Sequence, residues 1–319
     1  MTMTDLKELV NEMEQRRKSR ELYQVALAIF VCSALLAGGY LLWPKSATTV
    51  AEVPEAPPGP SAFDGIAVSA KAAIVYDLTT GEVLYAKNAE AQLPLASLTK
   101  LLTLYAASIA MEDATPVTIS AKALATEGET GFHEGDVFRF DELAKLALVG
   151  SSNDAAAAIA EAAIKAQQAP NGGALLASAA SAIGLTQTYA LNGTGLDENQ
   201  GIAGAYGSAQ DMAMLAGELV KRIPVIARAT IDSSVTVSSL AGSSYTLKNT
   251  NPDTAHIPGL LLSKTGYTDL AGGNLAIVFD AGINHPIAVV VLGSTKEERF
   301  RDVDLLVRAT AAEFAGLTL

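Results

Sequence analysis

The chain has 319 residues, half of them hydrophobic, which is enough for one large domain or two small domains with a buried core. Its formal net charge of -12 would repel a phosphate backbone, so the composition argues against nucleic acid as a partner. Because Cys32 is the single cysteine and the three histidines lack an H-x-x-x-H spacing, we expect no intrachain disulfide, no metal site and no other cofactor.

The first predicted element is a membrane anchor helix over residues 21–43. Residues 22–43 are almost entirely apolar and reach the roughly twenty residues that a helix needs to cross a bilayer. Four basic residues lie between positions 16 and 20, and this bias keeps the amino terminus in the cytoplasm. The sequence predicts a single-pass protein of the cell membrane, with a cytoplasmic tail over 1–20. A cleaved signal peptide is the alternative, but its apolar region is usually only about 7–15 residues long.

A proline-rich linker is predicted over residues 44–62. Four prolines fall between positions 54 and 60, among small and polar neighbours that hold neither a helix nor a central strand. Such a segment is semi-extended and would lift a folded domain off the membrane. That domain is predicted over residues 63–319.

Strands are predicted at both ends of this domain, with helices between them. The strand patterns occupy residues 72–77, 82–87, 273–280 and 286–293, and the first two are typical of a hairpin. The helical patterns occupy residues 97–111, 140–149, 153–168, 173–183, 208–222 and 297–315. Asp141 and Ser208 are the expected caps of two of these helices. Strands from distant segments imply one sheet with helices on its faces, an α/β fold of the α+β kind.

The first candidate for chemistry is Ser97-Leu-Thr-Lys100, at the start of an apolar helical segment. Ser97 would lie on the first turn, where unpaired N–H groups and the helix dipole favour developing negative charge. Lys100 would project from the same face, close to the serine hydroxyl. A buried lysine has a depressed pKa and is a suitable base for such a nucleophile, although a capping serine beside a solvated lysine fits this short motif equally well.

The second candidate is the short polar turn Gly150-Ser151-Ser152-Asn153, between two predicted helices. The hydroxyl of Ser151 is suited to relaying a proton, and the carboxamide of Asn153 to holding a substrate amide. Taken alone, these residues also fit an ordinary N-cap of the alanine-rich helix that follows.

The third candidate is Lys264-Thr265-Gly266, which follows an apolar run and predicts the end of an edge strand beside a site. Lys264 supplies positive potential, and Thr265 supplies a hydroxyl. Gly266 leaves room for a peptide that lies alongside the strand. By itself, this motif also fits a plain strand end.

In this order, S-x-x-K, S-x-N and K-T-G resemble the signature set of penicillin-binding proteins and class A β-lactamases, without the middle Asp of S-D-N. Further matching runs lie at 73–85, 195–197, 208–212 and 263–269. With these, the chain from 62 to 319 resembles the low-molecular-mass D-alanyl-D-alanine carboxypeptidases. The resemblance implies a DD-peptidase/β-lactamase-like fold, a mainly antiparallel sheet flanked by helices plus a helical subdomain. It also implies a peptidoglycan stem peptide as substrate and β-lactams as covalent inhibitors.

The same resemblance implies a catalytic role for four residues. Ser97 is expected to be the acylated nucleophile of a serine DD-carboxypeptidase, and Lys100 its base. Ser151 and Asn153 are expected to line the opposite wall, with Ser151 passing a proton to the leaving amine.

The remaining site residues are expected to bind the substrate. Lys264 and Thr265 would hold its terminal carboxylate, and the backbone N–H groups of Tyr267 and of the nucleophile would meet the oxyanion. Arg299 is the nearest match to an arginine that commonly helps bind the carboxylate in this family.

The sequence departs from the family pattern at two places. A histidine that often precedes Gly-Leu-Asp is Thr194 here, which puts any role of that histidine in doubt. Well-known members carry an extra carboxyl-terminal β-domain and an amphipathic anchor helix. This sequence ends about where the catalytic domain is expected to end, and its amino-terminal span is expected to replace that anchor.

Three other functions share parts of this pattern. A class A β-lactamase needs a glutamate that holds a water, but no Glu-x-x-x-Asn arrangement occurs between Ser151 and Lys264, so we expect a slow, persistent penicilloyl adduct. A DD-endopeptidase that cuts cross-links would accept an extended residue on the carboxyl side, so dependence on a free carboxylate discriminates the two. A catalytically silent wall-binding module would have no need of Lys100.

Overall fold

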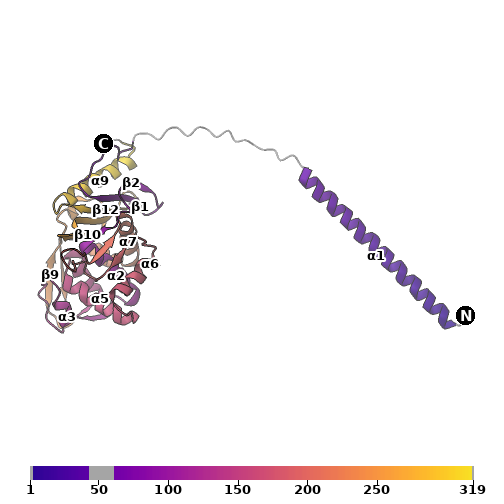
Figure 1. The fold of residues 1–319 in the computed structure, drawn as a ribbon, viewed down its shortest axis with the longest axis horizontal. Coiled ribbons are helices and arrows are strands. Elements are labelled where there is room, and N and C mark those ends of the chain that lie inside the picture. The colour runs from indigo at the N-terminus through magenta and orange to yellow at the C-terminus, as the bar shows by residue number, and fades with distance from the viewer. Residues whose placement is uncertain (1–2, 43–60, 318–319) are drawn as a thin grey trace. The chain divides into compact units, whose positions relative to one another are not determined.

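The computed structural model describes residues 3–42 and 61–317, and its contacts divide the chain into two units, Met1–Pro58 and Gly59–Leu319 (Figure 1). The first unit holds helix α1 (Met3–Leu42), which contains the predicted anchor segment 21–43 as far as residue 42. Within the described ranges, no helix has both the length and the apolar character that a membrane crossing requires. The predicted linker at 44–62 lies outside the described residues except for its last two positions.

The second unit is built around a five-stranded antiparallel sheet in the order β10-β11-β12-β1-β2. Its strands are β1 (Ala72–Asp77), β2 (Val83–Lys87), β10 (Leu260–Thr268), β11 (Gly272–Asp280) and β12 (Pro286–Ser294). Strands from the two ends of the unit meet where β1 pairs with β12, for example at Ile74 and Val290. The prediction that distant segments share one sheet is confirmed, and the predicted bounds of β1, β2, β11 and β12 hold to within one residue.

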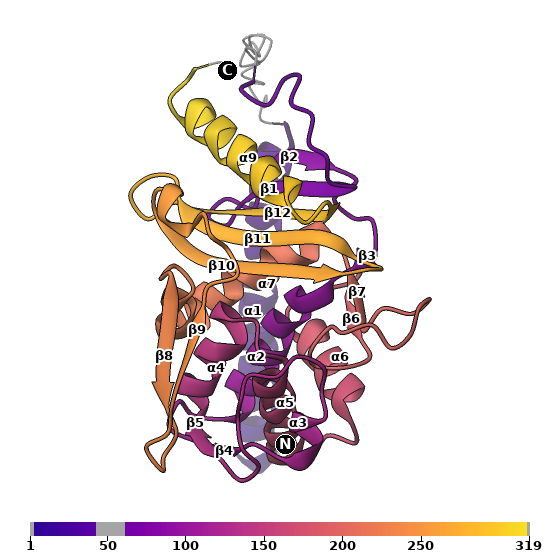
Figure 2. The same ribbon diagram turned by 90° about the vertical axis from the view of Figure 1, so that its left-hand side faces the viewer.

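Helices cover both faces of this sheet (Figure 2). The helices are α2 (Thr99–Ala110), α3 (Ala121–Leu124), α4 (Phe140–Val149), α5 (Asn153–Gln167), α6 (Gly172–Ala182), α7 (Ala209–Arg222), α8 (Pro224–Ala229) and α9 (Glu298–Phe314). Two short 3₁₀ turns are η1 (Ala96–Leu98) and η2 (Thr254–His256). Helix α9 packs on one face, and α7 with the helical block behind it packs on the other. The predicted helical subdomain is therefore present.

The alternation of side chains along each strand separates two hydrophobic cores. On β1, Ile74 joins the core shared with the helical block, whereas Ala73 and Val75 join the core beneath α9. A strand that is buried on both faces must be apolar at every position, which is the pattern of the central strands here.

Between residues 61 and 317, three smaller sheets accompany the large one and were not predicted from the sequence. Their strands are β3 (Leu93–Pro94), β4 (Pro116–Thr118), β5 (Val137–Arg139), β6 (Tyr189–Ala190), β7 (Ala205–Gly207), β8 (Ser234–Ser238) and β9 (Ser244–Lys248). They pair in the orders β3-β7-β6, β4-β5 and β8-β9. Of these, the hairpin β8-β9 matters most for function because it ends beside the candidate site.

One predicted cap is confirmed and one is wrong. The side chain of Ser208 accepts a hydrogen bond from the N–H of Asp211 at 3.0 Å and caps α7. Asp141 does not cap α4, because the N–H of Phe140 is bound to the carbonyl of Thr115 at 2.8 Å and the helix already begins there. Asp141 lies in the first turn instead, where its negative charge stabilises the helix by interacting with the positive end of the helix dipole.

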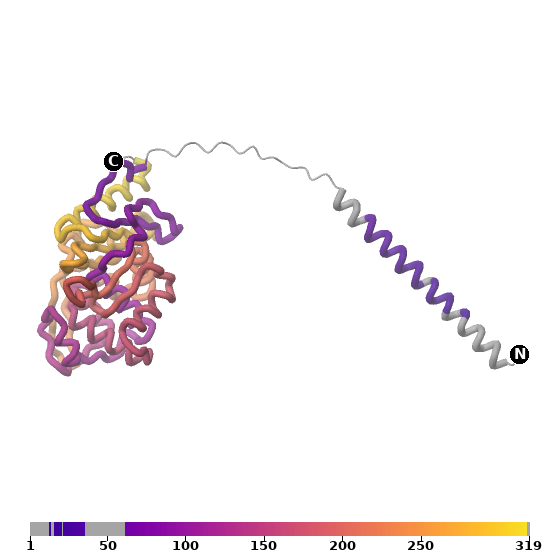
Figure 3. The backbone as a smooth tube through the Cα atoms, viewed as in Figure 1, coloured from indigo at the N-terminus to yellow at the C-terminus, as the bar shows by residue number. Residues whose placement is uncertain are grey.

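The first described residues of this unit lie against its last helix (Figure 3). The carboxylate of Glu313 on α9 accepts a bond from the Ser61 hydroxyl at 3.0 Å and from the N–H of Ala62 at 2.6 Å. Both ends of the unit are thereby tied to the face of the sheet that carries α9.

Candidate active site

Ser97 lies in the 3₁₀ turn η1, which leads directly into α2. The preceding residue, Ala96, has φ +47°, a backbone conformation that costs free energy in a residue with a side chain and recurs at functional sites. The turn is held tightly, because the Thr99 hydroxyl bonds to the Ala96 carbonyl at 2.7 Å and a Cβ on Gly195 would stand 1.9 Å from that carbonyl. The turn presents Ser97 at a strained, packed corner.

Lys100 lies one turn further along and is fully buried. Its ammonium nitrogen Nζ is 2.8 Å from Ser97 Oγ, 2.7 Å from Asn153 Oδ1 and 2.9 Å from the carbonyl oxygen of Thr194. Burial lowers the pKa of Lys100 to about 7, because water no longer stabilises the charged form. The structure therefore places a lysine that is readily deprotonated in direct contact with the serine hydroxyl.

The turn Gly150–Ser152 joins α4 to α5, whose first residue, Asn153, contacts Lys100. Ser151 has φ +58°, and Ser152 caps α5 by accepting from the N–H of Ala155 at 3.1 Å. Because Ser152 provides the cap, Ser151 and Asn153 are left to face the cleft. The Nδ2 of Asn153 donates to the carbonyl of Glu127 at 2.7 Å, which orients its Oδ1 toward Lys100.

Lys264 reaches this turn from β10, the edge strand of the large sheet. Its Nζ lies 2.9 Å from Ser151 Oγ and 2.9 Å from the carbonyl of Thr265. Burial, and then the positive charges of Lys100 and Arg299, lower the pKa of Lys264 well below its usual value. Two buried lysines, each with a lowered pKa, thus lie in one cleft.

The K-T-G motif lies inside β10 and not at a strand end as predicted. The pairing of β10 with β11 continues past Gly266 to Thr268 and Gly272, so the strand extends beyond the motif. A Cβ on Gly266 would stand 2.9 Å from the carbonyl of Leu95 and 3.3 Å from the N–H nitrogen of Leu98. The strand therefore lies directly against the turn that carries Ser97, and the three motifs converge on one cleft.

Thr265, Tyr267 and Arg299 have different surroundings. The Thr265 hydroxyl bonds to the hydroxyl of Thr250 at 2.7 Å. The side chain of Tyr267 is partly exposed, with the Lys296 nitrogen 5.3 Å from its ring centre. Arg299 is only 6% exposed, and its Nη1 donates to the carbonyl of Gly266 at 2.6 Å.

Sequence reasoning missed several groups of the site. The carbonyls of Thr194 and Glu127 carry no sequence signal, because every residue has a carbonyl. The hairpin β8-β9 had a signal: two alternating runs around Ala241-Gly242 fit a strand-turn-strand pattern. Its Leu247 packs so closely that a Cβ on Gly150 would stand 2.3 Å from it, which explains the glycine before Ser151.

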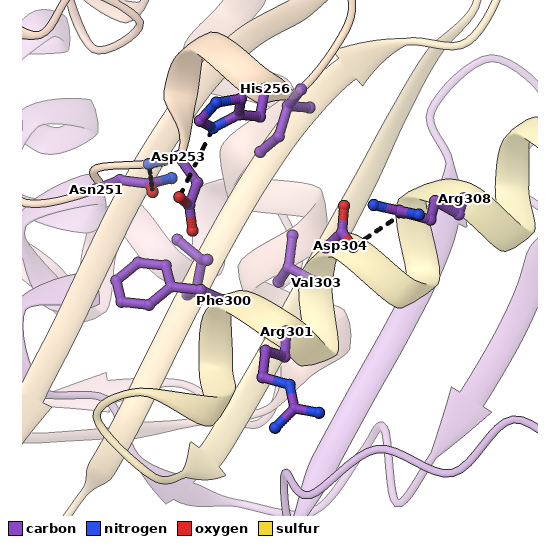
Figure 4. Close-up of a pocket in the computed structure, with 10 residues that line it drawn as sticks. Asn251, Asp253, His256, Phe300, Arg301, Val303, Asp304 and Arg308 are labelled. Atoms are coloured by element: carbon purple, nitrogen blue, oxygen red, sulfur yellow. Dashed lines mark hydrogen bonds and ion pairs between the residues drawn. The ribbon is translucent and has the colours of Figure 1, made fainter.

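Two of the hollows on this unit differ in their relation to the cleft. One, of about 600 Å³, is bounded by Tyr267, Thr268 and the segment 196–200, and continues the cleft beyond the end of the K-T-G motif. The other, of about 460 Å³, lies against α9, where Asp304 pairs with Arg308 at 2.9 Å (Figure 4). None of the predicted site residues lines the second hollow, so it is separate from the cleft.

The sequence profile of the D-alanyl-D-alanine carboxypeptidases matches residues 56–296 of this chain. The chain belongs to this family. It is 33% identical over 254 residues to the D-alanyl-D-alanine carboxypeptidase DacF of Bacillus subtilis, covering 75% of this chain and 64% of that protein. The chain thus spans less than two thirds of the length of that relative. A D-alanyl-D-alanine endopeptidase of Pseudomonas aeruginosa is 29% identical over 254 residues, covering 74% of this chain and 75% of that protein.

Solved structures agree with this assignment. The ampicillin-bound penicillin-binding protein D2 of Listeria monocytogenes superposes with a TM-score of 0.62 at 25% sequence identity, covering 77% of this chain and 98% of that one. The predicted DD-peptidase-like fold is confirmed.

Proposed function

We propose that the chain is a serine DD-carboxypeptidase that removes the terminal D-alanine from D-Ala-D-Ala stem peptides through an acyl-enzyme. The observation that carries the proposal is the 2.8 Å contact between Lys100 Nζ and Ser97 Oγ inside a buried site. Family membership supports the substrate class, since DacF is named for this activity.

In the first step, neutral Lys100 takes the proton of the Ser97 hydroxyl as Oγ attacks the carbonyl carbon of the penultimate D-alanine. A C–O bond forms, and the carbonyl oxygen becomes an oxyanion that accepts bonds from the backbone N–H groups of Ser97 and Tyr267. A pKa of about 7 for Lys100 supports this role, because a large share of the lysine is neutral near neutral pH.

In the second step, the C–N bond breaks and the leaving amine needs a proton. Ser151 supplies it from its hydroxyl and takes back the proton that Lys100 received, so that Lys100 is neutral again. The 2.9 Å contact between Lys264 Nζ and Ser151 Oγ holds this hydroxyl at the cleft and supports its role as the donor. Water then attacks the acyl carbon as neutral Lys100 takes a proton from it. The bond to Ser97 Oγ breaks, and Oγ takes that proton back from Lys100.

The free carboxylate of the substrate binds at β10. The negative charge of the incoming carboxylate favours the ammonium form of Lys264, which binds it together with the Thr265 hydroxyl. That hydroxyl exchanges its bond to Thr250 for one to the carboxylate. Asn153 holds the substrate amide through its carboxamide. Because recognition of a free carboxylate selects the chain end, this arrangement favours a carboxypeptidase over an endopeptidase.

The test is release of D-alanine from a peptide that ends in D-Ala-D-Ala. We expect release from that peptide and at least tenfold slower cleavage of its carboxamide, because a buried polar site rejects an analogue that lacks its charged partner. Benzylpenicillin is expected to leave a persistent adduct at Ser97, measured as added mass. Equal cleavage of a cross-linked dimer would favour the endopeptidase, and no added mass would favour the silent module.

We also propose that residues 21–43 anchor the chain in the cell membrane with its amino terminus in the cytoplasm. Large apolar side chains on α1 are exposed, and Leu22, Phe30 and Leu35 are each 71% exposed. Basic residues precede these three in the sequence. The chain is expected to stay in the pellet when membranes are washed with alkaline carbonate. Recovery of the full chain in the wash would contradict the proposal.

A further inference from the structure

We propose that Arg299 is a positioning residue that strengthens the oxyanion site from behind, by binding the carbonyl of the peptide group whose N–H faces the cleft. The inference rests on the proposed function of Ser97 and concerns the same reaction. It differs from the expected role of Arg299 as a direct ligand of the substrate carboxylate.

The contact itself is short and buried. Nη1 of Arg299 donates to the carbonyl of Gly266 at 2.6 Å and makes a longer bond to the carbonyl of Asn274 at 3.5 Å. The guanidinium carbon also lies 4.7 Å from the ring centre of Phe300. The side chain therefore lies behind the sheet, between the backbones of β10 and β11.

The carbonyl that Arg299 binds belongs to the same peptide group as the N–H of Tyr267. Along an edge strand, alternate residues direct their backbone groups toward the partner strand and toward the open edge. The carbonyl of Thr265 accepts a bond from Lys264 in the cleft, which indicates that Thr265 faces the open edge. Tyr267, two residues on, then directs its N–H to the same side as Thr265, whereas Gly266 faces β11 and Arg299.

This peptide group is also next to the nucleophile. The close approach of Gly266 to Leu95 and Leu98 puts the 266–267 peptide against η1, in which Ser97 stands between those two residues. The N–H of Tyr267 is thus directed into the cleft beside the backbone N–H of Ser97. These are the two donors on which the proposed oxyanion site depends.

A cation on a carbonyl oxygen changes the whole amide. Because the C–N bond has partial double-bond character, a charge-assisted bond to the oxygen draws electrons from nitrogen and makes the N–H a stronger donor. In a buried site this effect is larger than in water. The bond also fixes the peptide plane, so that the donor needs no reorganisation when the oxyanion forms.

The burial of Arg299 supports a role in the oxyanion site. Neither of its two hydrogen bonds goes to a carboxylate, and its Nε has no partner among the described residues. A buried guanidinium without a carboxylate partner destabilises a fold. Charged groups retained under such conditions are typical of functional sites.

The test measures acylation of the 319-residue chain by two thioester acyl donors, one with a terminal carboxylate and one whose terminus is a neutral amide. In Arg299→Met, the rate constant for acyl-enzyme formation is expected to fall about tenfold with both donors. This is less than the ~100–1,000-fold loss seen when a whole oxyanion donor is removed. Arg299→Lys is expected to lose less, because an ammonium still donates to the carbonyl.

The control is Arg301→Met, since this neighbour on α9 has an 80% exposed side chain and is expected to leave both rate constants unchanged. The rate constant is read and not the amplitude, because the amplitude counts folded active molecules. If Arg299→Met does not fold, the comparison of donors is made in Arg299→Lys.

A loss confined to the carboxylate-bearing donor would assign Arg299 to direct carboxylate binding and overturn the inference, as would no loss with either donor. If the unsubstituted chain forms an acyl-enzyme with neither donor, the proposed function itself is overturned. The two failures are therefore distinguishable.

Discussion

Replacing Ser97 by alanine is expected to abolish both the release of D-alanine and the covalent adduct with benzylpenicillin. Alanine has no oxygen to attack the carbonyl carbon. The base, the proton donor and the oxyanion donors of the site all assist this attack and cannot replace it. Loss of a nucleophile that acts as one unit with its base reduces turnover by more than ~10⁴-fold. The measurements are D-alanine release from a D-Ala-D-Ala peptide and the mass of the chain after penicillin treatment.

A matched control uses a serine outside the site. Ser178 on α6 is exposed, so Ser178→Ala is expected to keep full activity and full adduct formation. Equal thermal unfolding midpoints for the two variants would show that the fold is intact. Adduct formation at an undiminished rate in Ser97→Ala would mean that another side chain is the nucleophile.

Replacing Lys100 by methionine is expected to slow acylation by about 10²- to 10⁴-fold, the usual contribution of a general base. Methionine fills similar space without a nitrogen, so the Ser97 hydroxyl, 2.8 Å from Nζ in the structure, would lose its proton acceptor. The measurement is the rate constant of acylation by benzylpenicillin. Lys165→Met on the exposed side of α5 is the control and is expected to acylate normally.

The pH dependence of acylation tests the same role independently. Burial lowers the pKa of Lys100 to about 7 from an unperturbed value of 10.5, so the neutral form that acts as base grows as the pH rises through 7. The rate constant is therefore expected to rise with pH, with a midpoint near 7, and to level off above it. A midpoint near 10 would show that Lys100 is not the base, or that water reaches it in solution.

Local patterns in the sequence were sufficient for most of the large elements. The alternation and apolar content of β1, β11 and β12 reflect burial, which the side chains themselves encode, so their bounds were predicted to within one residue. The Ser208 cap was predicted because a side-chain oxygen before a helix satisfies its N–H groups. Short, edge-lying pairs such as β3-β7-β6 bury little and leave no such pattern.

For the site, the sequence by itself determined which residue types occur and in what order, because S-x-x-K, S-x-N and K-T-G are marked by their side chains. Only the tertiary structure decided that Lys100 loses its water and binds the carbonyl of Thr194, and that Arg299 turns to a carbonyl behind β10. The reason is physical. Burial and backbone acceptors depend on which distant segments pack together, and a carbonyl is the same group at every position in the sequence.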